Sequence, residues 1–189
     1  MALPQLAGRP LVTDGGMETD LIFHHGVDLP LFAAFPLVDS PSGRTLLTAY
    51  YDEYAAISRR AGAGLMLESA TWRASSDWGD RLGYSAADLA RVNRDAISML
   101  AELRERYRED LADVVISGMV GPRGDGYQPG EEPGPGELDE APDLDEGDIG
   151  LLADRHRQLA GDLPAVVIVG GCCGTDARHV GALWDLSLP

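Results

Sequence analysis

The sequence contains no lysine, and this absence excludes two kinds of chemistry. All fifteen basic residues are arginine, so neither a Walker-type phosphate loop nor a Schiff-base lysine is available. Thirty-one acidic residues oppose the arginines and give a formal net charge of −16 at pH 7. Because this charge repels a phosphate backbone, we expect no nucleic-acid partner.

Long apolar runs and a leader pattern are also missing. Nothing in the chain approaches the ~20 consecutive apolar residues that cross a bilayer. Residues 1–16 lack the basic region, apolar core and cleavage site of a signal peptide. We therefore expect a cytoplasmic protein with no membrane partner. At 189 residues the chain is expected to form a single domain over 1–189.

Short, nearly continuous apolar runs alternate with helical periodicity. The apolar runs lie at 10–13, 64–67, 114–117 and 165–169, and helical patterns lie at 43–61, 85–110, 148–161 and 176–186. Continuous apolar runs are typical of parallel strands that are covered on both faces. The alternation predicts an α/β fold with a parallel sheet of about four βα units.

One segment, residues 124–148, breaks this alternation. It has four prolines, nine acidic residues between Glu131 and Asp148, and no sustained apolar period. This composition predicts a solvated loop, and an acidic docking surface is the alternative interpretation.

The only two cysteines, Cys172 and Cys173, are adjacent and follow the last apolar run. Side chains of neighbouring strand residues point in opposite directions, but Gly170, Gly171 and Gly174 could let the backbone turn until both sulfurs converge. Converging thiolates suit Zn²⁺. Three other interpretations stay open: buried core residues, a strained vicinal disulfide, or a single nucleophile with a lowered pKa.

Four segments together resemble the homocysteine S-methyltransferase family. They are "DGGMETDL" at 14–21, "ESATWRAS" at 68–75, "ISGMVGPRGDGY" at 116–127, and "GGCCGT" at 170–175, which Asp176 follows. The resemblance covers residues 9–127 and about 137–184. It implies a (βα)₈ TIM barrel with zinc at the carboxyl ends of its strands, and a methyl transfer to homocysteine that serves methionine biosynthesis.

The resemblance assigns roles to individual residues. It implies Cys172 and Cys173 as zinc ligands. Asp14, with the backbone of Gly15 and Gly16, would bind the amino acid part of homocysteine.

Thr71 flanks the pocket in this comparison, and Glu18 is a further substrate-binding candidate; Asp14 and Thr71 are the candidate catalytic residues. Plainer interpretations exist for each: a turn residue for Asp14, a strand-end hydroxyl for Thr71, and an acid in a first helical turn for Glu18.

Histidines and tryptophans receive structural interpretations. His24 and His25 precede Gly26, where a helix is expected to end, and show no spacing that makes them metal ligands. His179 is expected at the surface, with a place beside the metal ion as the alternative. The tryptophans, Trp72, Trp78 and Trp184, are expected to pack in the interior, with a cage for a cationic methyl donor as the alternative.

The sequence also departs from the family pattern. A (βα)₈ barrel has eight strands in ~250 residues, whereas this chain has four candidates and no third cysteine. We therefore expect an incomplete barrel, with 124–148 in place of the missing part. Association of copies of the chain could complete it. An inactive relative that only binds a ligand or partner, or a truncated remnant, are the alternatives to an active enzyme.

Overall fold

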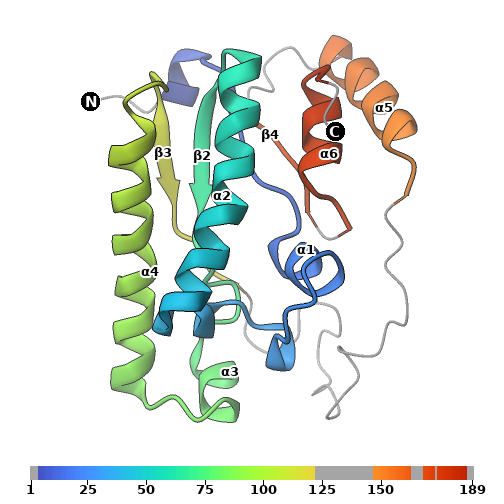
Figure 1. Ribbon diagram of the computed structural model, residues 1–189. Helices are drawn as coiled ribbons and strands as arrows, with labels where there is room; N and C mark the ends of the chain where they lie inside the picture. Colours follow the sequence, from blue (N-terminus) through green and yellow to red (C-terminus); the bar gives the residue numbers. More distant parts are fainter. Residues whose placement is uncertain (1–3, 122–146, 163–167, 173, 187–189) are drawn as a thin grey trace.

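A four-stranded parallel sheet lies at the centre of the molecule (Figure 1). The computed structural model describes residues 4–121, 147–162, 168–172 and 174–186. The strands are β1 (Leu11–Val12), β2 (Gly64–Glu68), β3 (Val114–Ser117) and β4 (Ile168–Val169), in the order β3-β2-β1-β4. Leu11 pairs with Gly64 on one side and with Ile168 on the other. The first and last strands of the described chain are therefore neighbours.

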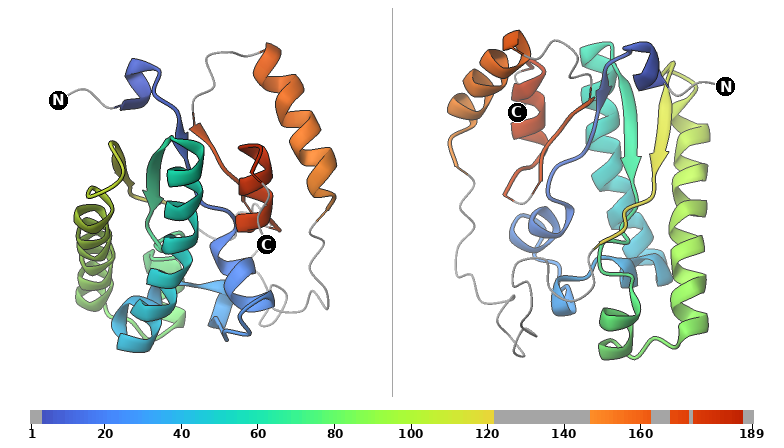
Figure 2. Two further views of the ribbon diagram at one scale, coloured as in Figure 1. Left: turned by 45° about the horizontal axis from the view of Figure 1, so that its top comes forward. Right: turned by 180° about the vertical axis from the view of Figure 1, so that it is seen from behind.

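In the described part of the chain, six helices and three short 3₁₀ segments accompany the strands. The helices are α1 (Met17–Phe23), α2 (Pro41–Ala61), α3 (Ser76–Arg81), α4 (Ala86–Tyr107), α5 (Ile149–Asp162) and α6 (Ala177–Leu183). The 3₁₀ segments are η1 (Pro4–Ala7), η2 (Pro30–Phe32) and η3 (Phe35–Asp39). α2 packs on β1 and β2, and α4 packs on β3. Seen from behind, the strands lie in front of α2, so this helix covers one face of the sheet (Figure 2).

Both long helices begin at capping residues, and α2 is also followed by one. The Ser40 side chain accepts a hydrogen bond from the Gly43 N–H, and α2 ends at Gly62, whose φ of 64° is left-handed. At α4, Ser85 and Asp88 form a reciprocal capping box, in which each side chain bonds the backbone N–H of the other residue.

One apolar core joins the sheet to its helices. Leu65 and Leu67 of β2 point into it, and so do three tyrosines of α2 (Tyr50, Tyr51 and Tyr54), each at most 2% exposed. Val180 of α6 belongs to the same core. The core thus connects the beginning of the described chain with its end.

The α/β class and the parallel sheet predicted from the sequence are confirmed. Four parallel strands alternating with helices are compatible with part of an α/β barrel. The fourth predicted strand is described only at Ile168–Val169, and the acidic segment at 124–148 lies outside the described residues except for its last two. No described helix combines the length and the apolar character that crossing a bilayer requires.

Candidate functional site

A cavity of about 220 Å³ opens at the carboxyl ends of the strands. Loops that follow β1, β2, β3 and β4 all contribute to it. Its walls are formed by Asp14, Gly15, Gly16, Met17, Glu18, Phe32, Glu68, Ser69, Ala70, Trp72, Met119, Gly171 and Cys172. This is the edge at which parallel α/β proteins place their reactive groups. Its volume lies below the ~300 Å³ at which drug-sized ligand sites begin, so it suits a ligand of amino acid size.

The loop after β1 and the loop after β4 are joined by backbone hydrogen bonds. Gly171 N–H donates to the Asp14 carbonyl oxygen at 2.8 Å, and Gly16 N–H donates to the Thr175 carbonyl oxygen at 2.8 Å. Gly174 N–H donates to the Thr19 hydroxyl at 3.2 Å. Segments that are more than 150 residues apart in the sequence therefore form one wall.

The glycines of the last loop serve two different purposes. A Cβ on Gly170 would lie 1.7 Å from Thr13 Oγ1, and one on Gly171 would lie 2.0 Å from Thr175 Oγ1. Only Gly174 of the three has a positive φ, 77°. The sequence interpretation, in which all three supply unusual backbone angles, is thus wrong for Gly170 and Gly171. Gly170 permits close packing against the loop after β1, and Gly171 permits the loop after β4 to pack closely on its own Thr175.

Asp14 is a buried carboxyl group at the wall of the cavity. It is 5% exposed, and the Tyr50 hydroxyl donates a hydrogen bond to its Oδ2 at 3.2 Å. Burial raises the pKa of Asp14 well above its usual value, and the negative charges of Glu68 and Glu18 raise it further, whereas the Tyr50 hydrogen bond lowers it. A cationic ligand beside Asp14 would stabilise its ionised form.

Glu18 and Glu68 line the same cavity as Asp14. Burial raises the pKa of each of them, and for Glu18 the positive charge of Arg73 acts in the opposite direction. Three carboxyl groups around one small cavity favour a ligand with a positive charge, such as an ammonium group.

Thr71 lies beside the cavity but does not line it. Its hydroxyl donates to the Met119 carbonyl oxygen at 2.8 Å and is 2.6 Å from the hydroxyl of Ser69, which accepts a hydrogen bond from the Met119 N–H. These contacts tie the loops after β2 and β3 together. They are the contacts expected of a strand-end hydroxyl, and they leave a catalytic role for Thr71 as a prediction.

Cys172 is exposed and forms part of the cavity wall. Its exposure contradicts the interpretation of this cysteine as a buried core residue. Cys173 lies outside the described residues, so the predicted pair of zinc ligands is represented by one sulfur. Among the described side chains, Cys172 belongs to no group of three potential metal ligands.

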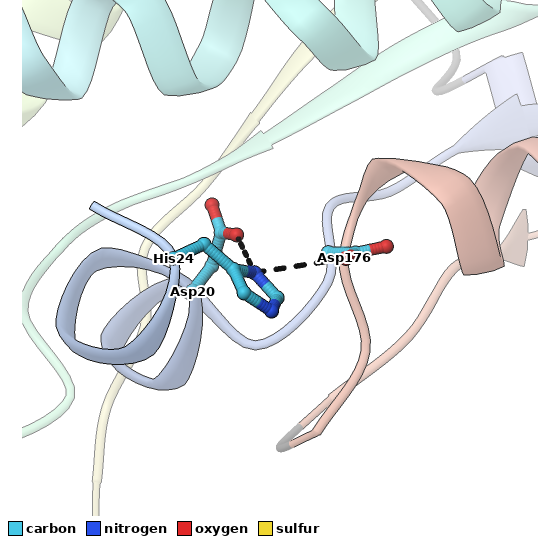
Figure 3. Close-up of side chains that lie close together, drawn as sticks. All are labelled: Asp20, His24 and Asp176. Atoms are coloured by element: carbon cyan, nitrogen blue, oxygen red, sulfur yellow. Dashed lines mark hydrogen bonds and ion pairs between the residues drawn. The ribbon is translucent and has the colours of Figure 1, made fainter. Parts of the chain in front are cut away.

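The group of potential ligands that the described residues do contain is Asp20, His24 and Asp176 (Figure 3). Their ligand atoms lie within 4.8 Å of one another. His24 Nδ1 is 2.7 Å from Asp20 Oδ1 and 3.6 Å from Asp176 Oδ2, so the cluster joins the end of α1 to the start of α6. The spacing of Asp20 and His24, four residues apart on one helix, is the sequence signal that the interpretation of His24 overlooked.

Asp176 already has partners at both of its oxygens. Arg178 Nη2 donates to Oδ2 at 2.6 Å, and His179 Nδ1 is 2.9 Å from Oδ1. His179 is 1% exposed, so the expectation of a surface histidine is wrong. Since a metal ion would have to displace Arg178, the geometry favours a network of ion pairs that holds α6 against α1.

A comparison with known families identifies the chain. A family model described as homocysteine S-methyltransferase matches residues 11–149. Neither a curated protein nor a solved structure matches the chain significantly. The matched region covers well over half of the sequence and contains three of the four strands, with Asp14, Glu18 and Glu68 of the cavity wall. The chain therefore belongs to the homocysteine S-methyltransferase family.

Proposed function

We propose that the protein transfers a methyl group from a sulfonium or betaine-type donor to the sulfur of homocysteine and forms methionine. The observation that carries the proposal is the cavity at the strand ends, where Cys172 and three carboxyl groups line a space of amino acid size. In the reaction a new S–CH₃ bond forms at the homocysteine sulfur, the thiol loses its proton, and the donor's bond to the methyl group breaks.

The carboxyl groups suit the amino acid part of homocysteine. Asp14 and Glu18 would bind its ammonium group, and their raised pKa values would fall again beside this cation. The backbone of Gly15 and Gly16 supplies further polar groups at the same wall. Thr71, which fixes the neighbouring loops, would act on the substrate only through a rearrangement of its present hydrogen bonds.

Zinc is the cofactor that the family resemblance implies. Cys172 fits this role because its side chain is exposed at the cavity, and we propose Cys173 as the second ligand. Bound zinc would supply deprotonation of the homocysteine thiol, which at its ordinary pKa of ~8.5 is mostly protonated at neutral pH. A tetrahedral catalytic site usually has three protein ligands, so two sulfurs should hold zinc less tightly than such a site does.

Metal content and product formation test this proposal together. The purified protein should contain zinc at a level approaching one ion per chain and should form methionine from homocysteine and S-methylmethionine or glycine betaine, as followed by mass spectrometry. Cys172→Ser should lower both, whereas Asp20→Asn, which alters the other cluster, should leave the zinc content unchanged. If the purified protein contains no zinc, or if only Asp20→Asn loses zinc, the proposed zinc site at Cys172 and Cys173 is contradicted.

An inactive binding protein is the second candidate function. The observation that favours it is the short sheet, because four strands provide only part of the wall that a closed barrel gives to its site. Such a protein would show a thermal shift with homocysteine but no methionine formation.

We also propose that copies of the chain associate. Among the described residues β3 pairs with β2 alone and β4 pairs with β1 alone, so both outer strands offer backbone groups for pairing. A two-fold axis along the strands would bring β4 of one copy beside β3 of the other in parallel orientation. Sedimentation equilibrium should give a mass near twice 20.2 kDa, and a monomer at all concentrations would refute the association.

A further inference from the structure

A buried arginine, Arg73, lies among three aromatic rings next to the cavity. Its guanidinium carbon is 3.9 Å from the ring centre of Trp78, 4.8 Å from that of Trp72 and 5.8 Å from that of Phe32. The residue is 3% exposed. Two of the three tryptophans that could have held a cationic methyl donor, Trp72 and Trp78, therefore surround a cation of the protein itself.

The same arginine contacts a segment with an unfavourable backbone. Leu31 and Phe32 are consecutive and both left-handed, with φ of 55° and 54°. Residues with a Cβ adopt this conformation at a cost in free energy, so surrounding contacts must hold them there. Arg73 Nη1 donates a hydrogen bond to the Leu31 carbonyl oxygen, and its guanidinium faces the Phe32 ring.

This segment forms part of the cavity. Phe32 and Trp72 both line it, and their rings meet edge to face with centres 6.4 Å apart and an interplanar angle of 82°. They form an apolar wall in a cavity that also carries three carboxyl groups. Arg73 does not line the cavity, so its contacts reach the site through the two aromatic side chains, while its charge also acts on Glu18.

We propose that Arg73 is a positioning residue that holds Phe32 against Trp72 and thereby sets the affinity of the cavity for homocysteine. The guanidinium fork supplies two things at once: a hydrogen bond that fixes the left-handed backbone at Leu31 and a flat cation on which the rings stack. The choice of homocysteine as the ligand rests on the proposed function, whereas the clamp on the wall does not.

Kinetics of three variants test the effect on affinity. Arg73→Gln removes the cation and should raise the KM for homocysteine by about tenfold with a smaller change in kcat, since the wall shifts while the reacting groups stay. Arg73→Lys keeps the charge but not the fork and should give an intermediate KM. Arg81→Gln is the matched control: Arg81 also lies over the Trp78 ring, at 4.9 Å, but is exposed on α3, and its KM should equal that of the wild type. An unchanged KM in Arg73→Gln, or an equal rise in Arg81→Gln, overturns the proposal.

A double-mutant cycle separates positioning from general destabilisation. If Arg73 acts through Phe32, then Phe32→Ala should raise the KM similarly, and adding Arg73→Gln to it should change the KM little further. Full additivity of the two effects would show that Arg73 acts by another route.

Limited digestion with chymotrypsin, which cuts after Phe32 when this segment opens, needs no catalytic activity. Cleavage there should be about tenfold faster in Arg73→Gln than in the wild type or Arg81→Gln, because the open form becomes more populated. If Arg73→Gln is cleaved faster but the wild type forms no methionine, the role of Arg73 is supported and the proposed function is refuted. If the cleavage rates of all three proteins are equal, the role of Arg73 is refuted, whatever the enzymatic activity.

Discussion

Gly15 lies where the loops after β1 and β4 meet, and its hydrogen atom faces backbone and a buried hydroxyl. A Cβ at this position would be 2.5 Å from the Thr175 carbonyl oxygen and 2.9 Å from the Tyr54 hydroxyl oxygen. We expect Gly15→Ala to lower the free energy of unfolding by about 1–3 kcal/mol, because backbone atoms cannot move aside cheaply. Urea denaturation measures the change.

Gly118 provides the control for this substitution. It is exposed, has no positive φ, and a Cβ there would meet its first neighbour, Ile97 Cδ1, at 4.0 Å. Gly118→Ala should therefore change the free energy of unfolding by less than about 0.5 kcal/mol. If the two alanine variants are equally stable, the contact between the loops is looser than the structure indicates.

Asp14 predicts a particular dependence of stability on pH. Its folded-state pKa is raised, first by burial and then by Glu68, so between the unfolded pKa of ~3.9 and the folded pKa the native state binds more protons than the unfolded state. Stability therefore falls as pH rises through this window. The Asp14→Asn side chain cannot ionise. Its free energy of unfolding should therefore increase relative to that of the wild type as pH rises from 4, and urea denaturation at several pH values would measure this difference.

Tyr50→Phe tests the pKa of the same carboxyl group by removing a hydrogen bond to it. The Tyr50 hydrogen bond lowers the pKa of Asp14, so its removal should raise this pKa and reduce stability at neutral pH. If the difference in unfolding free energy between Asp14→Asn and the wild type became smaller with rising pH, this would contradict the raised pKa of Asp14.

At the level of secondary structure, the sequence predicts the long elements well. β3 is found at the predicted residues 114–117. α2 begins two residues earlier than predicted, and α4 begins one residue later and ends three residues earlier, because apolar periodicity and capping residues determine these elements locally. The seven-residue α1 and six-residue α3 were not delimited. Helices this short have little periodicity to detect and depend on tertiary contacts.

The site was predicted less completely than the fold. The four segments that resemble the family start at or near the ends of the strands, so they identified the loops of the cavity, since parallel strands align their carboxyl ends. Phe32 and Arg73 were not predicted as parts of the site. Phe32 is placed by a left-handed backbone and Arg73 is a buried cation, and neither feature produces a periodic signal in the sequence. The network of Asp20, His24 and Asp176 joins residues that are about 150 positions apart, and one sequence does not reveal such a pairing.

α6 depends on Asp176 for its start and for its attachment to α1. The carboxylate accepts hydrogen bonds from the backbone N–H groups of Arg178 and His179, and a helix of seven residues is not stable by itself. Asp176→Ala should lower the free energy of unfolding by more than the ~1 kcal/mol expected for Ser85→Ala, which removes an exposed cap from α4. If urea denaturation shows that both variants lose the same free energy of unfolding, then the contacts of Asp176 with His24 and Arg178 do not contribute to stability.

The same carboxylate contributes to acid sensitivity. Burial raises the pKa of Asp176, but the hydrogen bonds from Arg178 and His179 outweigh burial and lower it to about 2. Because the folded pKa is depressed, the stabilisation is present above the unfolded pKa of ~3.9 and is lost as pH falls through 2. The gap in unfolding free energy between the wild type and Asp176→Asn should shrink over this interval.

On the scale of the whole molecule, the continuity of the core decides between a folded protein and a remnant. Val12 and Leu65 of the sheet, Leu103 of α4 and Val180 of α6 belong to one buried cluster. A core that includes both ends of the described chain predicts that they unfold together. A remnant without stable packing would lose its parts separately and aggregate readily.

The three tryptophans allow this cooperativity to be measured at two places. Trp72 and Trp78 lie near the end of β2, while Trp184 follows α6 and its Nε1 donates to the Val169 carbonyl oxygen at 3.4 Å. Urea unfolding followed by fluorescence should give the same midpoint in the wild type and in Trp184→Phe, which reports only on the first two, and the same midpoint by far-UV circular dichroism. Separate midpoints would show that β4 and α6 detach before the rest, and would favour a remnant over an enzyme whose cavity needs the loop at Cys172.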